Sequence, residues 1–418
     1  MNLSAWLTYL ETLHPEEIEL GLDRVRLVAS KLGLDFSSKT VISIAGTNGK
    51  GSTSCFLVSL LQAAGKSTGL YSSPHLLKYN ERISINGADV KDSVLCHAFS
   101  RIERVRKDIS LTYFEFGTLA ALLIFAESEL DYIILEVGLG GRLDAVNIID
   151  ADLALITNIA LDHTEWLGDT REKIAFEKAG IIRQGGAVIF GEDDIPESLE
   201  KVISSKHARL YQSGKDFECY VSDGNWNWQG QGFKQAHCMH VTKIAEASLL
   251  DFFPSNAAMA LQAMLLLNID VTEGMLEQAY KQATLTGRFQ IIERGYTLVL
   301  DVAHNPHAAS YLSRNIQRYF PKQNVHILLG MLSNKDSQKT LSSLQGIASS
   351  WYVASLENSR GSEAKILYNE LQIFAQNRVS LFDSVQEAFH KAEQKMQAND
   401  VLLVTGSFYT VADVLELI

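Results

Sequence analysis

Short apolar runs alternate along the chain with longer stretches in which apolar residues recur at helical spacing. In the first half, residues 41–45, 132–137 and 153–157 form apolar runs of strand length. Helical patterns lie between them, as in 52–64 and 116–129. Buried strands that alternate with amphipathic or buried helices are typical of parallel α/β layers. We therefore expect an α/β protein whose sheet strands are largely parallel.

The pattern changes twice in the second half of the chain. From about residue 209 to 242, short alternating stretches with glycines predict a hairpin-rich insert or an edge sheet. A helical region over 256–283 follows, and residues 284–287 have the composition of an interdomain link. A second series of strands and helices then begins. Its strands are expected at 297–301, 325–329, 350–354, 379–382 and 401–405, with helices starting near Pro306, Ser337, Ser362 and Ser384.

This organisation predicts two domains, 1–284 and 285–418. A length of 418 residues exceeds one ordinary domain, and 46% hydrophobic residues supply enough material for two cores. The second series contains no G-x-G-x-x-G, so it predicts a doubly wound sheet without a dinucleotide fingerprint. Ligands are expected at the carboxyl ends of the strands and at the domain junction.

Charge and cysteine content exclude some classes of protein. A formal net charge of −12 argues against a broad nucleic-acid surface, although a local pocket can still hold phosphates. The four cysteines show no C-x-x-C pair and no zinc-like spacing, which favours reduced thiols. The start of the chain lacks a signal-peptide pattern, and the apolar run 119–126 is too short to span a bilayer. We expect a cytoplasmic protein with no membrane partner.

The strongest local signal is a glycine-rich turn between the first apolar run and a helical pattern. The turn reads Gly46-Thr47-Asn48-Gly49-Lys50-Gly51-Ser52. Glycines let backbone N–H groups approach phosphate oxygens at the start of a helix, and lysine adds a positive charge. The run departs from the G-x-x-x-x-G-K-[ST] pattern, because Gly51 stands where the hydroxyl residue is expected. A simple strand-to-helix turn would explain neither the lysine nor the glycines, so we interpret the run as a nucleotide site.

Polar residues follow other predicted strands. Glu136 ends one strand before a glycine-rich turn, and Asp162 and His163 follow another. Ser73 follows a third. Oxygen donors at the ends of parallel strands suit magnesium, whereas a solvent-exposed glutamate and a structural histidine are the alternatives. Lys178 reads by itself as a solvated helix residue.

Taken together, these motifs resemble one family. The ordered set comprises Gly46–Ser52, Ser73–His75, Tyr113–Thr118, Glu136–Asp144, Leu161–His163, Glu177–Gly180, Gly287–Phe289 and Asp301–Pro306. It is similar to the folylpolyglutamate synthase family of the Mur-ligase superfamily, and more closely to its bacterial bifunctional dihydrofolate synthase/folylpolyglutamate synthase members. The resemblance covers nearly the whole chain. It implies an N-terminal P-loop ATPase domain with the pterin site and a C-terminal Rossmann-like domain on the glutamate and nucleotide side of an interdomain cleft.

The resemblance also implies a set of site residues. The phosphates of ATP would be held by Gly46, Thr47, Asn48, Gly49, Lys50, Gly51 and Ser52, with other nucleotide contacts from Asn256, Arg288 and Asp301. Ser73, Glu136, His163 and a carbamylated Lys178 would hold two magnesium ions. The pterin substrate would contact Glu19, Leu20, Gly21, Thr112, Tyr113, Phe114, Glu115, Leu143, Asp144 and Ala145. Catalytic roles fall to Lys50, Glu136, His163, Lys178 and His304.

Two positions depart from the family pattern. Val146 stands where a threonine is often found, and Lys339 replaces a glycine. Neither lies in the phosphate loop or among the metal ligands that the resemblance implies. Because Val146 has no hydroxyl group, a hydroxyl contact at this position is not expected.

The implied reaction is ATP-dependent amide formation. ATP would phosphorylate the carboxylate of dihydropteroate or of a reduced folate such as tetrahydrofolate, and the amino group of L-glutamate would attack the acyl phosphate. Phosphoryl transfer of this kind needs alignment and charge neutralisation more than a covalent nucleophile. The sequence leaves open whether both activities are present and whether a monovalent cation takes part. A monomer is expected.

Three other functions compete with this interpretation. A Mur ligase acting on a nucleotide-linked cell-wall precursor would need a separate N-terminal domain, and the phosphate loop begins only about forty residues into the chain. A P-loop switch or motor ATPase would have no use for a second α/β domain. A non-catalytic folate-binding protein would not need Lys50 or the metal ligands.

Overall fold

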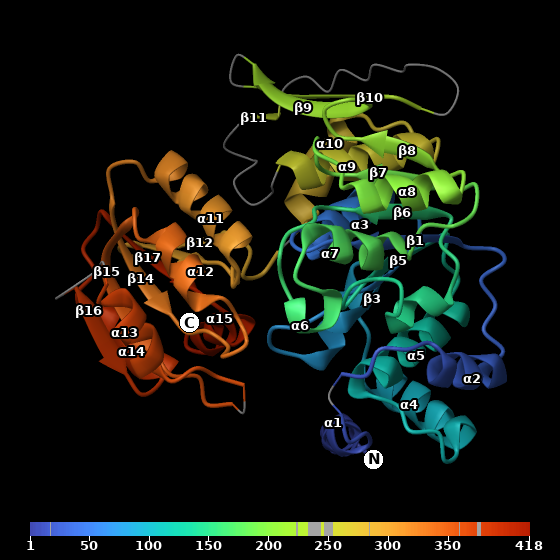
Figure 1. Ribbon diagram of the computed structural model, residues 1–418, viewed down its shortest axis with the longest axis horizontal. Coiled ribbons are helices and arrows are strands. Elements are labelled where there is room, and N and C mark those ends of the chain that lie inside the picture. The colour runs from blue at the N-terminus through green and yellow to red at the C-terminus, as the bar shows by residue number, and fades with distance from the viewer. Residues whose placement is uncertain are drawn as a thin grey trace. The chain divides into compact units, whose positions relative to one another are not determined.

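The computed structural model describes residues 1–16, 18–222, 225–232, 244–245, 254–283, 285–358, 360–373 and 378–418. The chain divides into two compact units, Met1–Thr284 and Leu285–Ile418 (Figure 1). Each unit is built on its own sheet. Among the described residues, no helix has both the length and the apolar character needed to cross a bilayer.

The first unit contains an eight-stranded sheet in the order β4-β3-β2-β5-β1-β6-β7-β8. The six strands from β2 to β8 in this order are parallel, and β3 and β4 extend the sheet antiparallel at one edge. The strands are β1 (Thr40–Ala45), β2 (Thr68–Tyr71), β3 (Ile83–Ile85), β4 (Ala88–Asp89), β5 (Tyr132–Glu136), β6 (Leu153–Ile156), β7 (Ala187–Phe190) and β8 (Arg209–Gln212). The predicted parallel α/β layer is confirmed.

Helices cover the sheet and connect its strands. They are α1 (Leu3–Thr12), α2 (Asp23–Leu32), α3 (Lys50–Ala63), α4 (Asp92–Arg106), α5 (Tyr113–Ala126), α6 (Thr164–Leu167), α7 (Arg171–Ala179), α8 (Glu197–Ser205), α9 (Pro254–Leu266) and α10 (Glu273–Gln282), with 3-10 turns η1 (Tyr79–Arg82) and η2 (Ala145–Ile148). Alternate strand residues such as Val41, Ile133 and Val188 join α4, α5, α7 and α8 in one apolar core. Strand residues alternate between the two faces, so this core lies on one face of the sheet.

The strand order places the phosphate-loop strand centrally. From β1 the chain crosses to β2 on one side, returns to β5 directly beside β1, and continues to β6 on the other side of β1. Such a reversal opens a crevice at the carboxyl ends of the strands. The loops after β1, β5 and β6 therefore lie at one edge of the sheet.

The segment predicted as a hairpin-rich insert is only partly of that kind. Arg209–Gln212 is β8, which pairs in parallel with β7 and so belongs to the main sheet. The antiparallel part is a separate small sheet of β9 (Phe217–Ser222), β10 (Asn225–Gly230) and β11 (Ile244–Ala245). Residues 223–224 and 233–242 of the predicted insert lie outside the described residues, as does Thr284 of the predicted link.

The second unit has a six-stranded sheet in the order β12-β13-β17-β14-β15-β16. Its strands are β12 (Gln290–Glu293), β13 (Thr297–Leu300), β14 (Asn324–Leu329), β15 (Ala348–Ala354), β16 (Val379–Phe382) and β17 (Asp400–Thr405). Its helices are α11 (Pro306–Tyr319), α12 (Ser337–Leu344), α13 (Ala364–Leu371), α14 (Val385–Glu393) and α15 (Phe408–Leu415). All five predicted strands are present and parallel, and β12 adds an antiparallel edge that the sequence pattern did not indicate.

Candidate nucleotide site

The glycine-rich turn joins the end of β1 to the start of α3. Two of its glycines have backbone conformations that other residues rarely adopt, with φ of 153° at Gly46 and 84° at Gly49. A β-carbon on Gly49 would lie 2.6 Å from the side-chain oxygen of the buried Asn256. Both glycines are therefore required by local geometry, and the predicted nucleotide residue Asn256 of α9 lies directly against the turn.

The turn is held in place by residues that follow β6. The Thr157 hydroxyl donates to the Asn48 carbonyl at 2.6 Å. The Asn158 side chain accepts from Asn48 N–H at 3.0 Å and donates to the Asn48 carbonyl at 2.7 Å. Thr47 N–H donates to the Asn158 carbonyl, and the Thr47 hydroxyl accepts from Ala160 N–H, both at 3.0 Å. These bonds fix the turn independently of any ligand.

Lys50 is the first residue of α3, where the free N–H groups of a helix favour anions. Its ammonium group folds back over the turn and donates to the carbonyls of Gly46 at 3.0 Å and Thr47 at 3.4 Å. Ser52 is buried in the first turn of the helix. The helix N-terminus and the lysine together place N–H donors and a positive charge at this turn, as in sites that hold phosphate groups.

Glu136 lies beside this turn because β5 pairs with β1, with Ile44 opposite Glu136. Its side chain is 3% exposed and accepts from Ser73 N–H at 3.3 Å. A β-carbon on Gly51 would lie 3.7 and 3.8 Å from the two carboxylate oxygens. The structure thus brings together Glu136, Ser73 and the glycine that departs from the usual P-loop pattern, and a buried carboxylate at this position suits a hard cation.

Lys178 is buried near the end of α7, with 3% of its surface exposed. The interpretation of Lys178 as a solvated helix residue was therefore wrong. Burial, and to a smaller extent the positive charge of Lys50, lower the pKa of Lys178 to about 7, while Asp162 and Asp144 oppose the shift. A lysine with this pKa is largely neutral just above pH 7, in contrast to an ordinary surface lysine.

His163 begins the short helix α6 in a left-handed conformation, with φ of 50° and ψ of 41°. Its N–H is turned toward the preceding Asp162, whose side-chain oxygen accepts at 2.9 Å. Within the described part of the chain, no cluster of three or more His, Cys, Asp or Glu side chains forms a metal site. The predicted ligand set contains only two residues of these types, Glu136 and His163, and depends otherwise on Ser73 and a modified Lys178.

The residues predicted for the pterin gather around α5. Thr112 and Glu115 form a reciprocal capping box at its start. The buried Glu115 also accepts from Arg24 at 3.0 Å, and Arg24 pairs with the half-exposed Glu19. The segment of residues 18–21 is thereby tied to α5, and Leu20 and Gly21 lie in this segment.

A second part of the predicted substrate region is aromatic. Arg82 lies 5.4 Å from the ring of Tyr79 and 5.7 Å from that of Tyr113. Phe114 lies so close to Gly138 that a β-carbon there would be 2.6 Å from its ring. Cation–π contacts of this type hold flat rings in defined orientations.

Asp144 closes the glycine-rich turn after β5. It accepts from Leu139 N–H at 2.7 Å and from Val146 N–H at 3.0 Å. Burial raises the pKa of Asp144 to about 6, against these N–H donors and the charge of Lys50. Its neighbours Leu143 and Ala145 are half-buried and buried. The turn is thus held by two hydrogen bonds to a carboxyl group whose pKa is well above its ordinary value.

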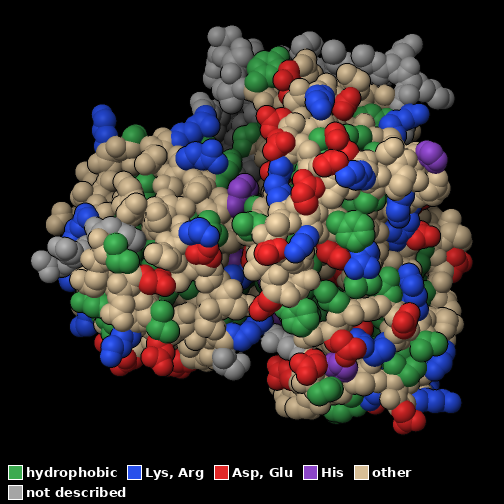
Figure 2. All heavy atoms as spheres, viewed as in Figure 1, with side chains coloured by type: hydrophobic (Ala, Val, Ile, Leu, Met, Phe, Trp, Pro, Cys, Tyr) green, Lys and Arg blue, Asp and Glu red, His purple; other side chains and the backbone are tan. Residues whose placement is uncertain are grey.

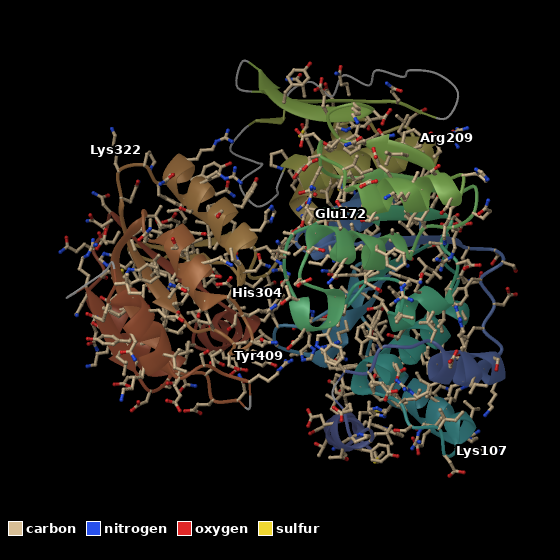
Figure 3. All side chains as sticks on the ribbon, in the orientation of Figure 1. Lys107, Glu172, Arg209, His304, Lys322 and Tyr409 are labelled. Atoms are coloured by element: carbon tan, nitrogen blue, oxygen red, sulfur yellow. The ribbon has the colours of Figure 1, made fainter. Side chains whose placement is uncertain are left out.

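The predicted residues of the second unit form a cluster of their own. The guanidinium of Arg288 lies 4.8 Å from the ring of Phe408, and His304 lies 6.0 Å from the same ring. Asp301, at the end of β13, accepts from Phe289 N–H and Ala303 N–H, both at 2.8 Å. Burial raises the pKa of Asp301, and Arg288 opposes that shift. His304 lies in the segment between β13 and α11, and Figure 3 labels it on the second unit.

Several residues that shape the site gave no clear sequence signal. Thr157 and Asn158 follow an apolar strand, and position alone could have suggested them because that strand neighbours β1. Arg24 and Arg82 act through contacts to residues far away in the sequence, which no local pattern encodes.

Comparison with known proteins identifies the class. Residues 44–264 match the Mur ligase middle domain, and residues 287–408 match the Mur ligase, glutamate ligase domain. The dihydrofolate synthase/folylpolyglutamate synthase of Escherichia coli is 44% identical over 417 residues, covering 100% of this chain and 95% of that protein. The Haemophilus influenzae protein of the same name is 39% identical, covering 98% and 96%.

Solved structures agree with these relatives. A structure of E. coli FolC in complex with DHPP and ADP superposes with a TM-score of 0.92 at 43% identity, covering 100% of this chain and 97% of that one. The bifunctional enzyme from Yersinia pestis complexed with AMPPNP and Mn ion gives a TM-score of 0.91 at 43% identity, covering 100% and 98%. Fold, site and matches together define a Mur-type ligase with a P-loop ATPase domain and a C-terminal α/β domain. Within that class, the chain belongs to the dihydrofolate synthase/folylpolyglutamate synthase family. The resemblance inferred from the motifs, the fold class and the assignment to ATP-dependent ligases are confirmed.

Proposed function

We propose that this chain joins L-glutamate by an amide bond to dihydropteroate and to reduced folates, using ATP. The observation that carries the proposal is the phosphate loop Gly46–Ser52, which residues after β6 hold by hydrogen bonds and which the buried Glu136 flanks. The chain that contains this loop is related over its full length to dihydrofolate synthase/folylpolyglutamate synthases. A cell-wall ligase would share the phosphate loop but not this full-length relationship.

The reaction divides into two steps. The substrate carboxylate attacks the γ-phosphorus of ATP, so that a carboxyl oxygen–phosphorus bond forms and the bond to ADP breaks. The amino group of glutamate then attacks the acyl carbon, phosphate leaves with the carbon–oxygen electron pair, and the nitrogen loses a proton. Lys50 and the N–H groups at the start of α3 would hold the phosphates in line for the first step.

The residues around Glu136 fit a divalent cation. Glu136 and Ser73 would supply oxygens, His163 would supply a ring nitrogen, and a carbamate on Lys178 would supply two further oxygens. Magnesium bound there would neutralise phosphate charge, and we assign two ions to this set. The Y. pestis relative, crystallised with AMPPNP and Mn ion, supports a divalent cation in addition to the nucleotide.

A carbamate on Lys178 is the second part of the proposal. Carbon dioxide reacts with a neutral amine, and burial together with Lys50 lowers the pKa of Lys178 to about 7. The product would carry a negative charge close to Lys50, in place of a second positive charge. The charge of Lys50 thus favours the modified form over the ammonium form, and burial favours the neutral amine that reacts.

For the acceptor substrate, we assign the pterin to the region of Glu19–Gly21, Thr112–Glu115 and Leu143–Ala145. The capping box, the Arg24 ion pairs and the aromatic contacts of Arg82 give this region defined walls. The relative crystallised with DHPP and ADP supports a pterin substrate in addition to nucleotide. Arg288, Asp301 and His304 stay predictions for nucleotide and glutamate, and the monomer and the cytoplasmic location stay predictions as well.

One assay tests the function directly. Purified protein with magnesium-ATP and glutamate is offered dihydropteroate or tetrahydrofolate, and ADP and the amide product are measured together. We expect equal amounts of ADP and product with both acceptors. If product formed only from tetrahydrofolate, the protein would be a folylpolyglutamate synthase without dihydrofolate synthase activity. ADP formation only with a uridine-diphosphate precursor would replace the proposal by a cell-wall ligase.

A further inference from the structure

A polar clamp lies on the side of the β6 loop that faces away from the phosphate turn. Arg171, the first residue of α7, donates through Nε to the Ile159 carbonyl at 3.0 Å and through Nη2 to Glu192 Oε2 at 3.0 Å. The same Glu192 oxygen accepts from Ile159 N–H at 3.0 Å. Both backbone groups of Ile159 are thus bound by one ion pair.

Ile159 is well placed to transmit this constraint. Its side chain is buried, and its neighbours Asn158 and Ala160 make the hydrogen bonds that hold Thr47 and Asn48 of the phosphate turn. The loop 157–160 is therefore bound on one side to the phosphate turn and on the other to Arg171 and Glu192. A peptide that is fixed on both sides has little freedom to shift along the sheet edge.

The base of the clamp is itself rigid. The turn after β7 packs closely against the same loop, since a β-carbon on Gly191 would overlap the Thr157 carbonyl. The buried Gln212, the last residue of β8, donates to the Asp193 carbonyl at 2.7 Å. Glu192 consequently projects from a turn that two neighbouring strands hold in place.

The clamp also reaches Lys178. Arg171 and Lys178 lie at opposite ends of α7, seven residues apart and hence about two turns along the same helix. One residue therefore binds the loop that supports the phosphate turn and anchors the helix that carries Lys178. Interspersed acidic and basic side chains cover this face of the first unit over α7 and α8 in Figure 2.

We propose that Arg171 and Glu192 are positioning residues for phosphoryl transfer, which set the phosphate turn through Ile159 and Lys178 through α7. The kinetic tests of this inference rest on the proposed function, whereas a measurement of nucleotide affinity tests the inference without ligase activity. Neither residue needs to touch ATP. Their effect is on the placement of groups that do, and displacement of such groups by about 1 Å can lower turnover by about 10²-fold.

The test compares Arg171→Ala and Glu192→Ala with Asp194→Asn. Asp194 pairs with the same arginine, but its side chain is 82% exposed and makes no contact with Ile159 among the described hydrogen bonds. We expect the two alanine variants to weaken ADP binding in calorimetry and to lower kcat/KM for ATP about 10- to 100-fold, with KM for glutamate unchanged. Asp194→Asn should match the wild type in every measurement.

Conservative variants and chemical rescue separate positioning from general stability. Glu192→Gln keeps an oxygen for Ile159 N–H and should retain more activity than Glu192→Ala. Arg171 borders an open pocket of about 590 Å³ together with Glu192 and Gly214, so added guanidinium ion can enter the space left in Arg171→Ala. Millimolar guanidinium should restore part of kcat/KM for ATP in that variant and leave the wild type unchanged.

Three results would overturn the proposal. One is nucleotide affinity and kcat/KM within about twofold of the wild type in both alanine variants. Another is a loss that appears equally in the KM of every substrate, follows the fall in Tm and does not respond to guanidinium. If the alanine variants do not fold, wild-type ADP affinity and kcat/KM in Arg171→Lys would be the third, because lysine lacks the planar group that binds the Ile159 carbonyl and Glu192 together. Absence of ligase activity in the wild type would instead remove the proposed function, while the ADP measurements would still decide on the clamp.

Discussion

The Thr157 side chain occupies the position that a side chain on Gly46 would need, at the edge of the first sheet. A β-carbon on Gly46 would overlap the Thr157 hydroxyl, and that hydroxyl donates to the Asn48 carbonyl in the same turn. The residue that excludes a larger side chain at the start of the phosphate turn thus also holds its middle. The φ of 153° at Gly46 is in addition one that side-chain-bearing residues rarely adopt.

Gly46→Ala is therefore expected to displace the phosphate turn. The backbone conformation alone should cost about 1–3 kcal/mol of unfolding free energy, and ADP affinity should fall by more than about tenfold. Gly65→Ala is the control, since Gly65 has a φ of 74° but open space around its Cα. Calorimetric titration with ADP and urea unfolding measure the two effects. Equal ADP affinity in Gly46→Ala and Gly65→Ala would contradict the role of the close contact.

Removal of the Lys50 ammonium should lower turnover far more than stability. The ammonium group is the charged donor over the turn, and loss of one transition-state donor typically lowers kcat about 10²–10³-fold. Lys66→Ala is the control, because Lys66 is an exposed lysine just after the same helix. The measurement is ADP release in the presence of both acceptor and glutamate. Near-wild-type turnover by Lys50→Ala would contradict a role of the phosphate loop in phosphoryl transfer.

The buried Lys178 predicts a pH-dependent stability difference. Its pKa is about 7 in the folded protein against an ordinary value of 10.5, so the unfolded chain binds more protons between these values. The unfolding free energy of the wild type should then rise with pH in this window, relative to a variant without the amine. Lys178→Met should be more stable than the wild type at about pH 7, by a margin that shrinks toward about pH 9.5.

Urea unfolding of both proteins in carbon dioxide-free buffer at the two pH values gives this margin. Lys173→Met is the matched control, because Lys173 lies on the same helix with its side chain 62% exposed. A margin that stays constant or grows with pH would show that Lys178 is not a buried amine of lowered pKa.

The proposed carbamate on Lys178 makes a separate prediction about activity. Lys178→Ala should lose most turnover and regain part of it with millimolar formate or acetate, whose carboxylate can stand in for the carbamate oxygens. Isotope-labelled bicarbonate should give a carbamate signal in the wild type and none in the variant. Lys173→Ala should show neither loss nor rescue. A bare amine in the structure of the ATP complex would count against the modification.

The sequence predicted the central strands β1, β5 and β6 of the first sheet and five of the six strands of the second, because buried parallel strands are short, apolar and bounded by turn residues. It did not predict β3, β4 or β7. Val379–Phe382 was placed with its correct limits, and α11 and α12 begin at the predicted Pro306 and Ser337, which follow the capping residues Asn305 and Asp336. The outer strand β12 was missed because its half-exposed residues lack the buried pattern. β8 was wrongly grouped with the antiparallel insert that follows it.

The site shows the same limit. The phosphate turn is a contiguous motif, so local chemistry identified it. The burial of Lys178 depends on α7 packing against the sheet, and the bonds of Thr157 and Asn158 depend on β6 pairing with β1. Neither relationship leaves a trace in local periodicity. Only the ordered family motifs pointed to Lys178 before the structure did.

The Arg24 ion pairs allow a last prediction, on the acceptor side of the site. Arg24 donates to the buried Glu115 at 3.0 Å and pairs with Glu19, so it ties residues 18–21 to the start of α5. Arg24→Ala should raise KM for dihydropteroate roughly tenfold, as expected for the loss of hydrogen bonds to charged groups, with KM for ATP unchanged. Arg26→Ala, at an exposed position on the same helix, should leave both constants unchanged. Because Glu115 would keep its bond to Thr112 N–H at 2.8 Å, α5 should retain its capping box and the variant should fold. If Arg24→Ala changed only the KM for ATP, the assignment of the pterin to this region would be wrong.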